Sequence, residues 1–237
     1  MKFYRPLKPF KAICFDLDDT LYDNHSVIKK AEHDFLIYLN KTYSELSELD
    51  VRQWGLYKNH LIREFPLLSE DVSLCRLEIL KRIMTIYGIP EYKAVEYAQT
   101  AFKEFLRLRS NFIVPTESIG LLEKLAKHYP IIAITNGNVD VKQIGLQNKF
   151  KFILKAGAQF KAKPQADMFI EAANRLNIKV SDILHIGDHI ISDVFGAQNN
   201  GAQAIWLNDS NQSLNGARLL PSVEITHIDQ LYSLITE

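Results

Sequence analysis

Apolar residues follow two different rhythms along the chain. A short, unbroken apolar run at residues 12–15 predicts a buried strand. From about residue 24 to residue 112, apolar residues recur every three or four positions, which predicts a series of amphipathic helices. Pro66 and the Gly-Ile-Pro sequence at residues 88–90 break this series. The chain therefore begins with one strand and then enters an all-helical block.

Beyond residue 113, predicted strands and helices alternate. The pattern predicts helices at residues 118–129, 139–147, 166–176 and 193–199. It predicts strands at residues 131–134, 150–154, 183–186 and 204–207. Such alternation is typical of a parallel sheet with helices on both faces, to which residues 12–15 add a strand. We therefore predict an α/β fold, a Rossmann-like doubly wound parallel sheet core (residues 1–21 and 113–237) with an inserted all-helical cap domain (residues 22–112).

Composition and charge narrow the possible partners. The 237 residues contain 28 Lys and Arg and 28 Asp and Glu, so no global field draws the protein to nucleic acid or to an acidic membrane. Cys14 lies in an apolar run and Cys75 in a helical pattern, so both are predicted to be buried thiols. We see no signal peptide and no apolar run of membrane-spanning length, and we expect a cytoplasmic protein that is a monomer or a weak homodimer.

Acidic residues crowd the end of the first predicted strand. Asp16 and Asp18 are two positions apart, so in an extended chain their side chains leave the same face. Repulsion between them raises the cost of ionising both, and a divalent cation would relieve that cost. The alternative is an acidic turn without chemistry, because Asp and Asn are common in turns.

Polar residues also follow the later strands, where parallel sheets bind ligands outside the carboxyl ends. They are Thr135, Asn136 and Gly137, then Lys161 and Lys163, then Asp188 and Asp193. Carboxylates, a hydroxyl, main-chain amides and a lysine are suited to hold a phosphate beside Mg²⁺.

Each of these residues also has a structural explanation. Residues 135–137 are typical of a turn, and Asp193 would suit a helix cap. On spacing alone, Lys161 competes with Lys163 for the cationic role. His185 is predicted to be a core histidine, and His189 a neighbour of the site and not a ligand.

Four segments resemble, in order, the four motifs of the haloacid dehalogenase-like hydrolase superfamily. They are residues 15–20 (Phe-Asp-Leu-Asp-Asp-Thr), 134–137 (Ile-Thr-Asn-Gly), 163–164 (Lys-Pro), and 186–188 (Ile-Gly-Asp) together with Asp193. They span nearly the whole predicted core. The helical insertion resembles the superfamily's small helical cap, placed as in its first cap class.

The resemblance implies a reaction. Asp16 would be the nucleophile that forms an aspartyl-phosphate intermediate, and Asp18 would be the general acid and base. Dehalogenases of the superfamily lack a carboxylate at this second position, so Asp18 favours phosphoryl transfer to water. The resemblance also implies that Thr135, Asn136 and Lys163 bind phosphate. It implies an Mg²⁺ ion held by Asp16, the main-chain carbonyl of Asp18, Asp188 and, in support, Asp193.

The expected substrate is a small phosphorylated metabolite. Residues 3–7, 16–24 and 133–138 are similar to bacterial phosphatases of flavin mononucleotide and of 5-amino-6-(5-phospho-D-ribitylamino)uracil, a compound of riboflavin biosynthesis. Alternatives are a phosphatase of a sugar phosphate, phosphoglycolate or a nucleotide, and a phosphomutase. A non-catalytic binding module would be expected to have lost a motif, and none is lost here. Specificity is expected to lie in the cap, with Tyr22, Trp54 and Tyr57 as candidates to stack on a flat heterocycle.

Overall fold

The computed structural model describes residues 1–215 and 217–236, and their contacts divide the chain into two units. The first, the α/β unit, consists of residues 1–23, 113–137 and the chain from residue 145 onward. The second, the helical unit, consists of residues 24–112 and 138–144. Within the described residues, no helix is both long enough and apolar enough to cross a membrane.

A single seven-stranded sheet forms the centre of the α/β unit, with strand order β1-β7-β6-β5-β2-β3-β4. The strands are β1 (Lys2–Phe3), β2 (Ala12–Phe15), β3 (Ile131–Thr135), β4 (Ile153–Lys155), β5 (Ile183–Gly187), β6 (Gln203–Leu207) and β7 (Val223–Ile225). All neighbouring strands are parallel except β1 and β7. The predicted Rossmann-like α/β core is therefore confirmed.

The register of the central strands brings their carboxyl ends to the same level. Phe15, the last residue of β2, pairs with Ala133 on one side and with Ile186 on the other. The main-chain N–H of Asp16 continues the ladder by donating to the Ile186 carbonyl at 2.8 Å. The residues that follow β2, β3 and β5 consequently emerge side by side at one edge of the sheet.

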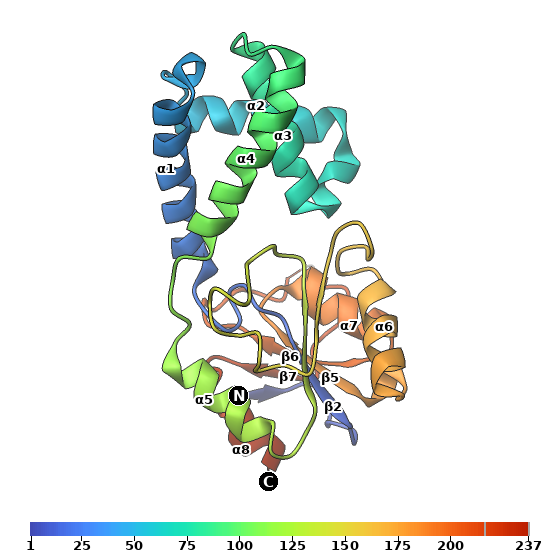
Figure 1. Ribbon diagram of the computed structural model, residues 1–237. Coiled ribbons are helices and arrows are strands. Elements are labelled where there is room, and N and C mark those ends of the chain that lie inside the picture. The colour runs from blue at the N-terminus through green and yellow to red at the C-terminus, as the bar shows by residue number, and fades with distance from the viewer. Residues whose placement is uncertain (216, 237) are drawn as a thin grey trace. The chain divides into compact units, whose positions relative to one another are not determined.

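Helices cover both faces of this sheet (Figure 1). They are α5 (Thr116–Leu125), α6 (Asp167–Leu176), a π-helix (Ile190–Phe195), α7 (Gly196–Asn199) and α8 (Gln230–Thr236). α5 and α8 lie together on one face, and α6 and α7 cover the other. The central strands β2, β3 and β5 are mostly apolar and buried along their whole length because both faces are covered, and Cys14 is a buried free thiol as predicted.

The helical unit contains four long helices, α1 (Asn24–Thr42), α2 (Val51–Glu64), α3 (Val72–Ile86) and α4 (Glu91–Arg109). Their apolar stripes meet in one core, in which Phe35 packs edge-on against Trp54 and Phe105. Asp50 caps α2 in a capping box with Gln53, which satisfies main-chain N–H groups at the start of that helix.

Four predicted elements differ in the structure. The helix predicted at 118–129 is α5 (Thr116–Leu125), which begins two residues earlier and ends four residues earlier. Residues 139–147 form turns and not a helix, because the Asp140 carboxylate accepts from the N–H groups of Lys142 and Gln143, and Gly145 has φ 77°. The strand predicted at 150–154 is the shorter β4 (Ile153–Lys155). The helix predicted at 193–199 begins earlier, at Ile190, with a π-helical turn. The sequence prediction missed β1, β7 and α8, which are short.

Candidate active site

An ion-paired triad lies at the carboxyl end of the sheet. The Lys163 Nζ donates to the Oδ1 of Asp16 at 2.6 Å and to the Oδ1 of Asp193 at 2.5 Å. All three side chains are buried, with exposed fractions of 7% or less. Asp16 follows β2, and Asp193 lies in the π-helix that follows β5, so chain segments far apart in sequence meet at one ammonium group. Lys161, by contrast, is exposed.

Burial and charge shift the pKa values of this triad in different directions. Burial raises the pKa of Asp16 well above its ordinary value, Asp193 and Asp18 add to the effect, and Lys163 opposes it. Burial also favours the neutral forms of Asp193 and Lys163, but the ion pair outweighs it. The pKa of Asp193 is therefore lowered, with the help of a hydrogen bond from His185, and the pKa of Lys163 is raised.

Asp188 completes a cluster of carboxylates. One oxygen each of Asp16, Asp188 and Asp193 lies within 4.8 Å of the others. Burial, followed by the charges of Asp193 and Asp19, raises the pKa of Asp188 to about 7. Three carboxylates facing one lysine leave an excess of negative charge, and hard oxygen ligands at this spacing suit a divalent cation such as Mg²⁺. The cluster thus has the donor set that such an ion requires.

The side chain of Asn136 fixes the main chain of Lys163. Its Oδ1 accepts from the Lys163 N–H at 2.7 Å, and its Nδ2 donates to the Lys163 carbonyl at 2.9 Å. The amide is therefore engaged in both directions, and a phosphate contact at Asn136 would have to come from its main-chain N–H or from the second hydrogen of Nδ2. Thr135, at the end of β3, is buried, and its hydroxyl accepts from the Gly137 N–H at 2.9 Å.

Asp193 is held by groups from two elements. His185 Nε2 lies 2.9 Å from Asp193 Oδ1, and because a carboxylate can only accept, this nitrogen carries the proton. The His189 main-chain N–H donates to Asp193 Oδ2 at 3.0 Å. A Cβ on Gly187 would lie 2.3 Å from the Asp193 Cγ, so a side chain at residue 187 would displace the carboxylate. His189, and not Asp193, caps the π-helix, since its Nδ1 accepts from two N–H groups there.

The Asp18 carboxylate is held by groups outside the carboxylate cluster. Its Oδ1 accepts from the Tyr22 hydroxyl at 2.6 Å, and its Oδ2 lies against Gly137, where a Cβ would be 2.3 Å away. The expectation that Asp18 would offer a metal its main-chain carbonyl stays a prediction.

Sequence reasoning missed several contacts of the site residues, among them three made by ring-bearing side chains. Tyr22 binds Asp18, His185 binds Asp193, and the Trp206 Nε1 donates to the main-chain carbonyl of Asp188 at 2.6 Å. A polar residue inside the buried strand β5 was a signal for His185, but nothing near Trp206 in the sequence pointed to Asp188.

The aromatic residues expected to bind a substrate ring have structural partners. Trp54 is 6% exposed and packs on Phe35, and Tyr22 is 5% exposed and binds Asp18. Tyr57 is half-buried and lines a pocket of about 520 Å³ with Arg63 and Arg82.

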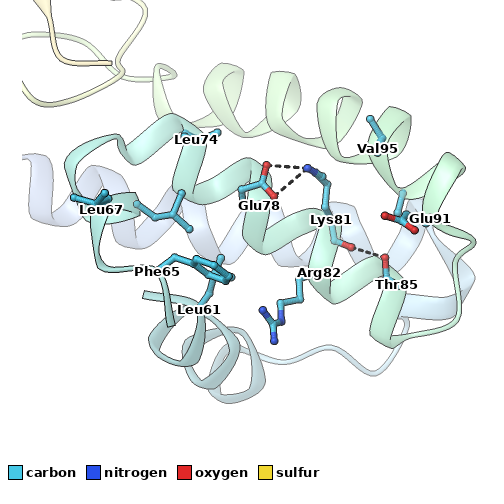
Figure 2. Close-up of a pocket in the computed structure, with 12 residues that line it drawn as sticks. Leu61, Phe65, Leu67, Leu74, Glu78, Lys81, Arg82, Thr85, Glu91 and Val95 are labelled. Atoms are coloured by element: carbon cyan, nitrogen blue, oxygen red, sulfur yellow. Dashed lines mark hydrogen bonds and ion pairs between the residues drawn. The ribbon is translucent and has the colours of Figure 1, made fainter. Parts of the chain in front are cut away.

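The helical unit also contains a larger pocket, of about 780 Å³ (Figure 2). Leu61, Phe65 and Leu67 line one end, and the ion pair between Glu78 and Lys81, with Nζ–Oε1 at 2.8 Å, lies in its wall. A volume of this size falls in the range of small-molecule sites.

The buried lysine and the clustered carboxylates lie at the carboxyl ends of the strands, which is where open parallel sheets bind ligands. The chain matches the haloacid dehalogenase-like hydrolase family over residues 10–201, and it belongs to that family.

Individual relatives agree with this assignment. The chain is 37% identical to the 5-amino-6-(5-phospho-D-ribitylamino)uracil phosphatase YigB of Escherichia coli (strain K12), over 99% of this chain and 100% of that protein. It is 26% identical to a glyceraldehyde 3-phosphate phosphatase of Pyrococcus furiosus, over 84% of this chain and 81% of that protein. The crystal structure of a 2-haloacid dehalogenase from Pseudomonas syringae pv. Tomato DC3000 matches with a TM-score of 0.87 and 32% identity, over 96% of this chain and 98% of that chain. Family membership and the whole-length phosphatase relative show that the protein is a phosphatase.

Proposed function

We propose that the protein is an Mg²⁺-dependent phosphomonoesterase that acts on a small phosphorylated metabolite through an aspartyl-phosphate at Asp16. The observation that carries the proposal is the meeting of Asp16, Lys163, Asp188 and Asp193 at one sheet edge. Asp18, which lies on the same loop, supplies the second carboxylate that phosphoryl transfer to water requires. In this proposal the helical unit serves as the cap that sets specificity, and the enzyme is cytoplasmic.

The chain's own residues account for the proton and bond changes. The Asp16 oxygen that Lys163 does not hold attacks phosphorus, while the bond from phosphorus to the leaving oxygen breaks and Asp18 gives that oxygen its proton. Asp18 then takes a proton from water, whose oxygen attacks phosphorus and frees the Asp16 carboxylate and inorganic phosphate. Lys163, Thr135 and the N–H groups near Asn136 would bind the phosphate oxygens.

The metal site of the proposal uses Asp16, Asp188, the Asp18 carbonyl and, in support, Asp193. Mg²⁺ bound there would offset the carboxylates and the phosphoryl charge. The spacing of the carboxylates supports this role, and the pKa of Asp188, which burial and then the charges of Asp193 and Asp19 raise, is consistent with a site that gains from a bound cation.

The first-choice substrate is 5-amino-6-(5-phospho-D-ribitylamino)uracil or flavin mononucleotide. The support is the name of the relative that is 37% identical along the whole chain. The glyceraldehyde 3-phosphate phosphatase relatives keep other small phosphate esters, such as sugar phosphates, phosphoglycolate and nucleotides, as alternatives. A phosphomutase remains the alternative reaction.

Product analysis tests the reaction and the substrate together. The purified protein is incubated with each phosphate ester, with Mg²⁺ or with EDTA, and free phosphate and phosphorylated isomers are measured. We expect Mg²⁺-dependent release of phosphate, most rapidly from 5-amino-6-(5-phospho-D-ribitylamino)uracil and flavin mononucleotide. A phosphorylated isomer without free phosphate would indicate a mutase. Chloride release from 2-chloropropionate without phosphatase activity would indicate the reaction named for the Pseudomonas structure.

The nucleophile is tested by Asp16→Asn, which keeps the side chain's shape but removes its charge. We expect turnover of p-nitrophenyl phosphate to be abolished and no phosphorylated protein to form. Asp34→Asn, a surface residue paired with Lys30 in the helical unit, is the control and should retain wild-type rates. Substantial activity in Asp16→Asn would exclude Asp16 as the nucleophile.

A further inference from the structure

Tyr22 lies at the end of a turn that is anchored from several sides. The N–H groups of Thr20 and Leu21 both donate to the Leu17 carbonyl, at 3.3 and 2.9 Å. The Ser118 hydroxyl, on α5, donates to the Leu21 carbonyl at 2.7 Å in a buried contact. Tyr22 itself is 5% exposed and pairs with Asp18 in an isolated parallel bridge. The tyrosine hydroxyl is therefore held in a defined position.

The two oxygens of the Asp18 carboxylate lie near different groups. The Tyr22 hydroxyl donates to Oδ1 at 2.6 Å, which is short for a hydrogen bond between two oxygens and typical of a charged acceptor. Oδ2 points to Gly137, at the end of β3, where a Cβ would be only 2.3 Å away. Thr135, a predicted phosphate-binding residue, also lies close to this point, with its Oγ1 3.3 Å from the same Cβ position. The two oxygens of Asp18 are thus oriented differently.

We propose that Tyr22 is a positioning residue, which holds Asp18 through Oδ1 so that Oδ2 carries out the proton transfers. The proposal rests on the proposed function, in which Asp18 is the acid and the base. A carboxyl group protonated on Oδ2 keeps Oδ1 as an acceptor, and so does the ionised carboxylate. The Tyr22 hydrogen bond therefore persists while Oδ2 gives its proton to the leaving oxygen and later takes one from water.

The test uses Tyr22→Phe and two leaving groups. Flavin mononucleotide releases an alcohol, which needs a proton as it departs, whereas p-nitrophenyl phosphate releases a stable phenolate, which does not. We expect kcat/KM for flavin mononucleotide to fall about 10- to 100-fold, a part of the ~10²- to 10⁴-fold that general acid catalysis contributes. For p-nitrophenyl phosphate, kcat/KM should fall less than about 3-fold. This constant covers only the steps up to departure of the leaving group, and a phenolate departs without a proton from Asp18.

Two further variants separate positioning from a structural effect. Tyr43→Phe removes a hydroxyl of similar burial, 7% exposed, whose partner is the Tyr97 carbonyl in the helical unit, and it should leave both substrates unaffected. In an Asp18→Asn background, Tyr22→Phe should cause less than about 2-fold further loss, because residues that act as one unit are not additive.

The outcomes are distinguishable. Equal losses for both substrates, no loss for either, or a full further loss in the Asp18→Asn background would overturn the role of Tyr22 and leave the proposed function intact. A wild-type protein that releases phosphate from neither ester would remove the proposed function, and the role of Tyr22 with it.

Discussion

Replacing Lys163 by methionine removes the cation that joins two buried carboxylates while keeping a side chain of similar length. Lys163 is 4% exposed, and its Nζ lies 2.6 Å from Asp16 Oδ1 and 2.5 Å from Asp193 Oδ1. Without the ammonium group, the clustered carboxylates of Asp16, Asp188 and Asp193 repel each other in a site that excludes water. We therefore expect both stability and activity to fall.

The expected magnitude follows from the burial of the pair. Removing one partner of a buried ion pair costs about 3–5 kcal/mol. In a chain of this length each kcal/mol shifts the melting temperature by about 2–4 °C, so the loss corresponds to roughly 6–20 °C. The loss should be larger at pH 8 than at pH 5, because at lower pH the clustered carboxyl groups can take up protons and lose their charge.

Lys161→Met is the matched control, because it makes the same chemical change two residues away on an exposed side chain. We expect it to change stability by less than about 0.5 kcal/mol, as exposed positions generally do. Thermal unfolding in EDTA and the rate of p-nitrophenyl phosphate hydrolysis would be measured for both variants. Unfolding of Lys163→Met at the wild-type temperature, or equal losses of stability and activity in the two variants, would contradict the expected role of the Lys163 ion pairs.

Two further predictions concern Asp188. Its folded pKa of about 7 lies above its ordinary value of 3.8, so the metal-free native state holds a proton that the unfolded chain releases between these pH values. This contribution to stability is full below pH 3.8 and is lost as the pH rises through about 7. The free energy of unfolding, measured with urea in EDTA, should therefore fall less steeply between pH 3.8 and about 7 in Asp188→Asn than in the wild type. An unchanged slope would contradict the raised pKa of Asp188. Trp206→Phe removes the hydrogen bond to the Asp188 carbonyl and should weaken activation by Mg²⁺ about 10-fold, measured by Mg²⁺ titration of activity, with unchanged activation as the contrary result.

Much of the fold could be predicted from the sequence because the signal is local. The period of apolar residues distinguishes the helices of residues 24–112 from the buried strands, and each period is contained in a few consecutive residues. The secondary-structure predictions were wrong where single residues oppose the apolar pattern or where an element is too short to show one. Residues 139–147 have a helical pattern of apolar residues but form turns, because of the side-chain hydrogen bond of Asp140 and the positive φ of Gly145. β1 and β7 have two and three residues, too few to show a period, and they pair across more than two hundred residues of chain.

The candidate site, too, could be predicted only in part from the sequence. The chemical groups of the site and their place after strands of a parallel sheet could be predicted from the sequence, because acidic and basic residues interrupt apolar runs at recognisable positions. The folded chain was needed to establish that Lys163 and not Lys161 reaches Asp16, across 147 residues of chain. It was also needed to establish that the Asn136 amide holds the lysine's main chain and that Tyr22 holds Asp18. Such pairings depend on the direction of side chains in space, and spacing along the chain does not encode it.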